Sequence, residues 1–396
     1  MAALVWPAAA SGALAQTRPL TLPDVLTRAR ERAPQVVSAQ LLLAETRARL
    51  PGASRRTTNP EIDIATGNRD AGSSRYTEFE VGVAQALEPA RRRQTRVDGV
   101  QASVAARASE VEEATRLTLR EAAAGYYRAV HAQERIRLLA AARDLARTAH
   151  ATADRRFRAG EIAILDVNVA RIALARVEAD QEAAEAATAL VLGDLAQLLG
   201  LEDVAVEGTL VTPEPSSVES ALRTAADRPE LRVLAADIQQ AEAAIGHALT
   251  YTRPEYGLAA RYTREEGDHI VLGGLRITLP LVATAQEPRD VASAQAARLR
   301  TELVMARTRI ESEVRSAHTA YSRRLNAVRV LERDALPTLD ENTQLNARSF
   351  DVGQIGLPEM LLVQREILEA RLHYLDALLE AALARVELDA RAGVLR

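Results

Sequence analysis

One turn pattern occurs twice in this chain, and the distance between its two copies limits what the whole chain can fold into. FRAGEIAILD begins at Phe157 and FDVGQIGLPE begins at Phe350, so that Gly160 and Gly353 are 193 positions apart (353 − 160). Each copy has a Gly three residues after the Phe and a carboxylate six residues after the Gly. A repeat at this spacing indicates two copies of one structural unit within 396 residues.

The duplication extends over nearly the whole chain. Matching segments occur in the same order in both halves: LPDVLTRARERAP with SVESALRTAADRP, NPEIDIA with RPEYGLA, VGVAQALEP with GGLRITLPL, and the LLG that ends at Gly200 with the AG that ends at Gly393. The sequence therefore predicts a first repeat over residues 16–200 and a second over residues 218–396. Residues 201–217, which contain Pro and Ser, are expected to link them.

Each repeat is expected to have the same order of elements. A short helix ends at a Pro, Pro34 or Pro229, and a second helix follows it. Two segments in which polar and apolar residues alternate come next and predict a β-hairpin. A helix of about sixty residues follows, from about 91 to 158 and from about 288 to 348, and the Gly turn then leads into a return helix over 162–199 and 357–392.

Composition excludes several classes of function. The chain has no Cys, which excludes disulfides, thiolate metal ligands and Cys nucleophiles. A net charge of −4 and the lack of a basic face with aromatic residues argue against a nucleic-acid partner. No phosphate-binding loop, nucleophile elbow or paired acid and base is visible, so neither catalysis nor a cofactor is expected. The six His have no pair at i, i+3 or i, i+4, so no metal site is expected.

The chain has no apolar run of about 18 residues after its first segment, so no helix is expected to cross a bilayer. The first segment, MAALVWPAAASGALAQ, is apolar and has Ala-Leu-Ala before Gln16, which predicts a signal peptide over residues 1–15. If the protein enters a membrane, it must do so with strands. Four strands cannot close on themselves in lipid, because open sheet edges are not tolerated there. Three copies would supply twelve strands, which the long helices could continue as a tube.

This organisation resembles the TolC family of outer membrane efflux proteins. The resemblance rests on the duplication, on TLPDVLTRARERAP near the N-terminus, on the two Gly turns, and on ALEPARRRQTRVDGVQA, which begins at Ala86. The last stretch and GLRITLPL are similar to the outer membrane components of CzcC-type heavy-metal efflux systems. The stretch that follows GLRITLPL, VATAQEPRDVASAQA, lacks the Arg-Asn-x-Gly expected there.

The resemblance implies a mainly α fold with a small β part. The expected assembly is a homotrimer in which a β-barrel in outer membrane lipid joins a periplasmic α-barrel. Such a channel belongs to a tripartite efflux system and receives its substrate, here heavy-metal cations, from an inner membrane RND pump through a periplasmic adaptor protein. Two alternatives stay open: a drug or small-organic efflux channel of the same family, and a soluble coiled-coil scaffold, for which the alternating segments have no use.

The resemblance places Asp166 and Glu359 near the periplasmic aperture, where a trimer would gather six carboxylates that favour cations. A carboxylate in the first turn of a helix is also stabilised by the helix dipole, and Pro358 is typical of an ordinary helix start, so a structural role stays open. Gly160 and Gly353 are expected to supply the positive φ that reverses a helix. The resemblance further implies that the two tips contact the adaptor through Phe157, Gly160, Ile162, Phe350, Gly353 and Ile355.

Overall fold

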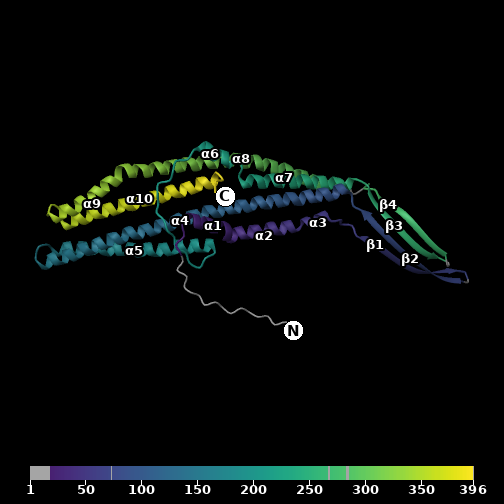
Figure 1. Cartoon of the computed structure of the whole chain (residues 1–396), viewed down its shortest axis with the longest axis horizontal. Helices are drawn as coiled ribbons and strands as arrows, with labels where there is room; N and C mark the ends of the chain where they lie inside the picture. The colour runs from purple at the N-terminus through teal and green to yellow at the C-terminus, as the bar shows by residue number, and fades with distance from the viewer. Residues whose placement is uncertain (1–17, 73, 266–267, 282–284, 396) are drawn as a thin grey trace, which may run out of the picture. The chain divides into compact units, whose positions relative to one another are not determined.

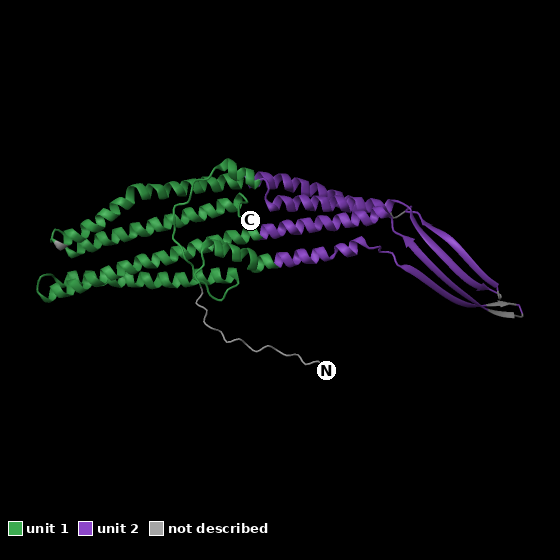
Figure 2. Ribbon diagram, viewed as in Figure 1, with its two compact units in different colours: residues 1–37, 115–225, 312–396 green, residues 38–114, 226–311 purple. Residues whose placement is uncertain are grey.

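The computed structural model describes residues 18–72, 74–265, 268–281 and 285–395 (Figure 1). These residues form two compact units (Figure 2). Unit 1 comprises the described parts of Met1–Val37, Thr115–Ala225 and Ser312–Arg396. Unit 2 comprises the described parts of Ser38–Ala114 and Ala226–Glu311. Each unit takes segments from both halves of the chain, so the compact units do not coincide with the two repeats. The predicted signal peptide over residues 1–15 lies outside the described residues.

The order of elements in the first half of the chain recurs in the second half. The first half contains α1 (Leu22–Arg32), α2 (Pro34–Ala48), α3 (Leu50–Ser54), β1 (Pro60–Ala71), β2 (Ser74–Leu87), α4 (Ala90–Arg158) and α5 (Ile164–Leu199). The second half contains α6 (Val218–Ala225), α7 (Pro229–Ala248), the 3-10 turn η1 (Leu249–Thr252), β3 (Glu255–Glu265), β4 (Asp268–Thr278), α8 (Gln286–Val330), the π-helical turn η2 (Leu331–Ala335), α9 (Leu336–Asp351) and α10 (Leu357–Arg391). Within the described part of the chain, no helix is both long and apolar enough to span a membrane.

Glycines in the left-handed conformation follow four long helices. Gly160, Gly353, Gly200 and Gly393 follow α4, α9, α5 and α10 and have φ values of 78, 76, 64 and 70°. In all four turns the Gly N–H donates to the carbonyl three residues back, and the next N–H donates to the carbonyl five residues back. This Schellman arrangement satisfies carbonyls that the end of a helix leaves unpaired. The expected positive φ at Gly160 and Gly353 is therefore confirmed.

The second long helix is interrupted, whereas the sequence predicted one helix over about 288–348. The break is the π-helical turn η2, in which the N–H of Leu336 donates to the carbonyl of Leu331, five residues back. Pro337 explains it, because proline has no N–H and its ring clashes with the carbonyl four residues earlier in a regular α-helix. The matching position of the first repeat is Asp144 (337 − 193), and α4 runs through it without a break.

The core of unit 1 is built from small and aliphatic side chains of α1, α4, α5 and α10. Val25, Leu119, Leu199 and Leu378 are among its buried members. Residues 201–217, which we call the strap, pack onto this core through Val204, Val206 and Leu210. The strap also forms an isolated parallel β-bridge between Val206 and Leu20. The segment predicted as a linker is thus an ordered part of unit 1.

Hydrogen bonds from distant helices hold the strap in place. Tyr126 on α4 donates its hydroxyl to the carbonyl of Glu207 at 2.8 Å, and the N–H of Leu210 donates to the carboxylate of Glu134 at 3.1 Å. Further along, Thr212 and Tyr374 both donate to the carboxylate of Glu332 in η2, and Tyr321 on α8 donates to the carbonyl of Glu214. Burial and the Glu332 carboxylate raise the pKa of Tyr374 to about 12, so its hydroxyl remains a donor.

Unit 2 contains an antiparallel four-stranded sheet in the order β1-β2-β3-β4. β1 and β4 are its edges, because among the described strands each pairs with only one neighbour. The helices of unit 2 approach closely through small residues: a Cβ at Gly99 on α4 would lie 3.7 Å from Ala243 Cβ on α7. On α7 and α8, Ala241, Ala296 and Leu299 form a small buried cluster.

Candidate functional site

The two tips of unit 1 are the turns from α4 into α5 and from α9 into α10. Their hydrogen bonds match: Gly160 N–H donates to Phe157 at 2.9 Å, and Gly353 N–H donates to Phe350 at 3.1 Å. A Cβ added to either Gly would contact nothing within 4 Å, so the requirement for Gly comes from φ alone. The predicted tip residues therefore lie at two equivalent and equally built turns.

An apolar cluster joins the two tips to each other. Val167 and Ala170 on α5 pack with Leu357, Met360 and Leu361 on α10. The half-buried side chains that pack against this cluster include three of the predicted adaptor contacts: Ile162, Phe350 and Ile355. Much of their apolar surface is thus used within the chain.

The apolar side chains that remain exposed at the tips are mostly different ones. Phe157 is 39% exposed, but Ile164, Leu165 and Val352 are 52, 68 and 70% exposed. None of these three is among the predicted adaptor contacts, although each lies within five residues of a tip Gly. Exposed apolar side chains grouped on a narrow turn are typical of a surface that another protein covers.

Asp166 and Glu359 occupy the same position in their helices, the third residue of α5 and of α10. Asp166 is partly exposed and Glu359 is exposed. Within the described residues, neither carboxylate has a hydrogen-bond or ion-pair partner, so both are available to solvent. The N-terminal end of each helix dipole stabilises the negative charge there. The structure therefore brings the two predicted carboxylates to the same level of one unit without committing them to a partner.

Arg156 connects the first tip to the second. Its guanidinium lies 5.1 Å from the centre of the Phe350 ring and 3.9 Å from the carboxylate of Glu161. Cation–π contacts at exposed sites contribute about 0.5–1 kcal/mol. Arg158, close to the same tip, forms an ion pair with Asp154 at 2.6 Å.

The sheet of unit 2 has one apolar face. In the β-register, Ile64 pairs with Val81, Val81 with Tyr262, and Tyr262 with Val271, so these side chains point to the same side. The neighbouring rows on this side contain Ile62, Val83, Leu258, Leu275 and Ile277. Ile64 and Leu275 are 70 and 61% exposed, because the described residues place nothing over this face. A sheet face of this kind in a single chain is a surface for lipid or for another protein.

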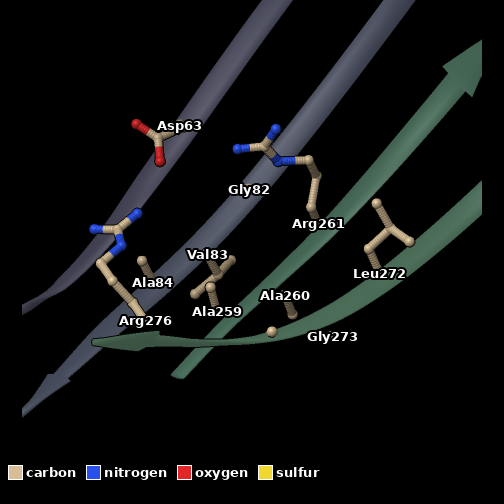
Figure 3. A pocket seen from close by; sticks show the side chains of 11 residues that line it. Asp63, Gly82, Val83, Ala84, Ala259, Ala260, Arg261, Leu272, Gly273 and Arg276 are labelled. Atoms are coloured by element: carbon tan, nitrogen blue, oxygen red, sulfur yellow. The ribbon is translucent and has the colours of Figure 1, made fainter. Parts of the chain in front are cut away.

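The opposite face of the sheet carries charged side chains together with small residues and the exposed apolar side chain of Leu272 (Figure 3). Arg261 lies 3.0 Å from the carboxylate of Glu80, and Arg276 lies 4.0 Å from that of Glu61. Asp63, Arg261 and Arg276 line a shallow cavity of about 190 Å³ above Gly82 and its small neighbours, as Figure 3 shows. The sequence analysis missed this face, although the alternation that predicted the strands also separates its residues from the apolar ones.

A buried ion pair fixes the sheet to the helix that follows it. Glu88, directly after β2, accepts a hydrogen bond from Arg96 on α4, and its side chain is only 2% exposed. Arg96 also donates to the carbonyls of Ala53 and Arg55 at 3.0 and 2.8 Å. The hydrogen bond from Arg96 holds the pKa of Glu88 below its ordinary value. Nearby, Arg92 pairs with Glu255 at 2.8 Å, which joins α4 to β3.

Metal ligands do not gather in the described part of the chain, where no three His, Asp or Glu side chains lie close enough to hold an ion. His131, one of the six His, instead shares a 2.7 Å hydrogen bond with Asp376 and so joins α4 to α10.

Known proteins resemble this chain in sequence over part of its length and in fold over nearly all of it. Residues 25–201 match the family model described as "Outer membrane efflux protein". The cobalt-zinc-cadmium resistance protein CzcC of Cupriavidus metallidurans is 24% identical over 276 residues, which cover 67% of this chain. The match spans 65% of the length of CzcC.

Solved structures resemble nearly the whole chain. Crystal structures of CusC match with a TM-score of 0.76 and 16% identity, over 94% of this chain and 91% of that one. The CmeC outer membrane channel of Campylobacter jejuni matches with a TM-score of 0.74 and 15% identity, over 99% of this chain and 94% of that one. The chain therefore has the fold of these channels.

Proposed function

Since residues 25–201 belong to the outer membrane efflux protein family and the whole chain has the fold of outer membrane channels, we propose that three copies form the channel of a tripartite efflux system. The channel conducts substrate from the periplasm to the cell exterior. Its sheet lies in the outer membrane and its long helices lie in the periplasm. An inner membrane pump supplies the energy for transport, and the channel itself catalyses no reaction.

The observation that carries this proposal is the two-faced sheet of unit 2. Its apolar face, with Leu258 and Leu275, suits contact with lipid, and its polar face, with Asp63 and Arg261, suits contact with water. Tyr256 and Tyr262 lie on the apolar face of β3 six residues apart, or about 20 Å along a strand. Aromatic side chains at both ends of an apolar band are typical of strands that cross a membrane.

The edges of the sheet support an assembly of several copies. Within the part of the chain that the structure describes, β1 and β4 each have one side without a strand partner, and unpaired strand edges are not tolerated in lipid. If β1 of one copy pairs with β4 of the next, three copies join their four strands into one closed sheet of twelve.

The tips of unit 1 support the proposal that this end of the protein contacts an adaptor and forms an aperture. The exposed side chains of Phe157, Leu165 and Val352 offer the periplasmic adaptor an apolar contact surface, next to the arginines of the first tip. Asp166 and Glu359, one pair from each of three copies, place six carboxylates at the end of the conduit. Such a ring favours cations and repels anions.

Heavy-metal cations are the substrate class that the similarity to CzcC favours, since that protein is described by its resistance to cobalt, zinc and cadmium. A drug or small-organic channel is the second candidate, because the fold alone does not distinguish the two classes. The scaffold alternative requires no exposed apolar sheet, and the sheet of unit 2 therefore argues against it.

Metal tolerance tests the proposal. A strain that lacks the protein is exposed to zinc, cobalt, cadmium, copper and a panel of drugs, and is complemented with the wild type, with an Asp166→Asn, Glu359→Gln variant, or with a control variant. The control, Asp180→Asn, Glu341→Gln, removes the same number of exposed carboxylates from α5 and α9 outside their first turns.

We expect sensitivity to metals that the wild type and the control correct and that the aperture variant corrects less well. Sensitivity to drugs alone would contradict the metal substrate class and would leave the channel function supported. Full tolerance of the deletion strain, together with a cytosolic location of the protein in the wild-type strain, would refute the channel itself.

A further inference from the structure

One row of side chains interrupts the apolar face of the sheet near its hairpin turns. In the β-register Phe79 on β2 pairs with Arg264 on β3, and Arg264 pairs with His269 on β4. This row is two residues away from the row of Tyr262 and Val271, so its side chains point to the same side of the sheet. Among the side chains of the apolar face that the structure describes, Arg264 carries the only permanent charge.

The guanidinium of Arg264 is exposed and has no hydrogen-bond or ion-pair partner among the described residues. The carboxylates at this end of β2 and β4, those of Glu78, Glu80 and Asp268, belong to the opposite face in the register. The described part of the chain therefore supplies no anion to this cation.

Tyr262 and His269 form a second polar group next to Arg264. Tyr262 Oη and His269 Nδ1 share a hydrogen bond of 2.6 Å, and the two rings are stacked with their centroids 5.9 Å apart. If the hydroxyl donates, a neutral His269 carries its hydrogen on Nε2, and if Nδ1–H donates, the hydroxyl hydrogen stays available. In either arrangement the pair keeps one donor for another molecule.

The position of Arg264 matches the border of an apolar band. It lies two residues beyond Tyr262, or about 7 Å further along the strand toward the hairpin turn. Val271 and Ile64, in the row on the other side, are 76 and 70% exposed. A cation on a lipid-facing strand is costly at the middle of a bilayer and costs little at its interface. Under the proposed function, Arg264 therefore lies at the depth of the lipid headgroups.

We propose that this end of the apolar face binds the phosphate group of an anionic lipid, with Arg264 as the charged contact and the Tyr262–His269 pair as a second donor. The guanidinium fork matches two oxygens of one phosphate. The exposed side chains of Phe79 and Val271 lie beside it and suit contact with the acyl chains. A dissolved phosphate ion would gain nothing from this apolar surface, which favours the lipid.

The inference rests on the proposed function in one respect, namely that the sheet lies in the outer membrane with its hairpin turns toward the exterior. Lipid binding to the full-length protein in detergent, measured by native mass spectrometry, provides the test. The probes are phosphatidic acid and diacylglycerol with the same acyl chains, which differ only in the phosphate.

We expect the wild type to bind phosphatidic acid about tenfold more tightly than diacylglycerol, because the charge-assisted hydrogen bonds need the phosphate. Arg264→Gln should remove most of this difference. Arg264→Lys keeps the charge without the fork and should remove a smaller part of it. Thr66→Arg adds a cation to the same row, next to Phe79, and should strengthen binding of phosphatidic acid, which a folding defect would not produce.

The matched control is Arg261→Gln, which removes an exposed arginine from the polar face of the same strand and should leave the difference between the two lipids unchanged. Unchanged binding in Arg264→Gln, or an equal loss in Arg261→Gln, would overturn the inference. Full displacement of phosphatidic acid by an equal concentration of inorganic phosphate would also overturn it, because the site would then recognise the free ion.

None of these three results affects the channel function as long as the protein fractionates with outer membranes. Recovery of the wild type from the soluble fraction without detergent would refute the proposed function, and the inference would fail with it.

Discussion

Gly208 in the strap is a position where a single added methyl group would come closer to its neighbours than van der Waals contact allows. An Ala Cβ at residue 208 would overlap the hydroxyl oxygen of Tyr126, and it would lie 3.3 Å from Tyr126 Cζ and 3.7 Å from Val130 Cγ2. The same hydroxyl donates the hydrogen bond to Glu207 that holds the strap against α4. Gly208→Ala must therefore displace the strap, the ring or both.

The size of the effect follows from the two interactions. Overpacking of a filled site costs about 1–3 kcal/mol, and loss of one hydrogen bond costs about 1 kcal/mol. Tyr126→Phe alone should therefore destabilise the strap by about 1 kcal/mol, and Gly208→Ala alone by about 2–3 kcal/mol. In the double variant the overlapping oxygen is absent, so the total should be about 1.5 kcal/mol less than the sum of the two single changes.

Hydrogen exchange of the strap, measured by mass spectrometry on the assembled protein, reports this local free energy. The N–H groups of Glu207 and Leu210, which donate to Leu20 and Glu134, are the informative ones. Additive effects of the two substitutions would refute the packing that we describe between Gly208 and Tyr126. Unchanged exchange in Gly208→Ala would show that the strap does not lie against α4.

Three further predictions concern the junction, a tip and the sheet. Because the pKa of Glu88 is lowered in the folded protein, its stabilising contribution is present above the unfolded pKa of about 4.3 and is lost as pH falls through the folded pKa. Glu88→Gln should cost about 2 kcal/mol of unfolding free energy at pH 7 and should make stability depend less on acid. Thermal unfolding between pH 3 and 7 measures both effects. Gly160→Ala should lower the unfolding free energy by about 1–2 kcal/mol because residue 160 has a positive φ. The control Gly193→Ala, inside α5, where an added Cβ also meets nothing, should raise it by up to about 1 kcal/mol. Equal unfolding temperatures of the two variants would contradict this prediction. Leu258→Arg places a charge on the apolar face and should cost about 2–4 kcal/mol near the middle of a bilayer. The neighbouring substitution Ala259→Arg lies on the polar face and should be tolerated. Similar amounts of both variants in the outer membrane fraction would contradict the assignment of faces.

The sequence was sufficient for the order of the elements and for the resemblance to the TolC family, which the family match and the fold confirm. Residues that restrict the local backbone made these predictions possible. Pro34 and Pro229 each begin a helix, and Gly160 and Gly353 each follow one with a positive φ, because these residues restrict the backbone wherever they occur.

The sequence was not sufficient for features that depend on distant partners. The strap was predicted as a linker, and only the structure shows that Tyr126 and Tyr321 bind it from 81 and 107 positions away. Ile162, Phe350 and Ile355 are half-buried because α5 and α10 meet at the tips, which periodicity within one helix does not indicate. The roles of these residues and of Asp166 and Glu359 at an adaptor or an aperture, and the repeat limits at 200 and 218, stay predictions.

The pairing of β1 of one copy with β4 of the next is the central claim, and disulfide cross-linking tests it most directly because the chain has no Cys of its own. Ile64→Cys on β1 is combined in turn with Val271→Cys, Gly273→Cys or Leu275→Cys on β4. Within one chain β1 and β4 are three strand spacings apart, about 14 Å, which is too far for a disulfide. Ile64→Cys with Val81→Cys, adjacent in the register, serves as the positive control for a bond within one chain.

After oxidation of intact outer membranes, the account predicts that at least one β1–β4 pair yields covalent dimers and trimers and no larger species on a denaturing gel. Monomers alone from all three pairs, while the control pair forms its bond, would contradict the assembly on which the channel depends.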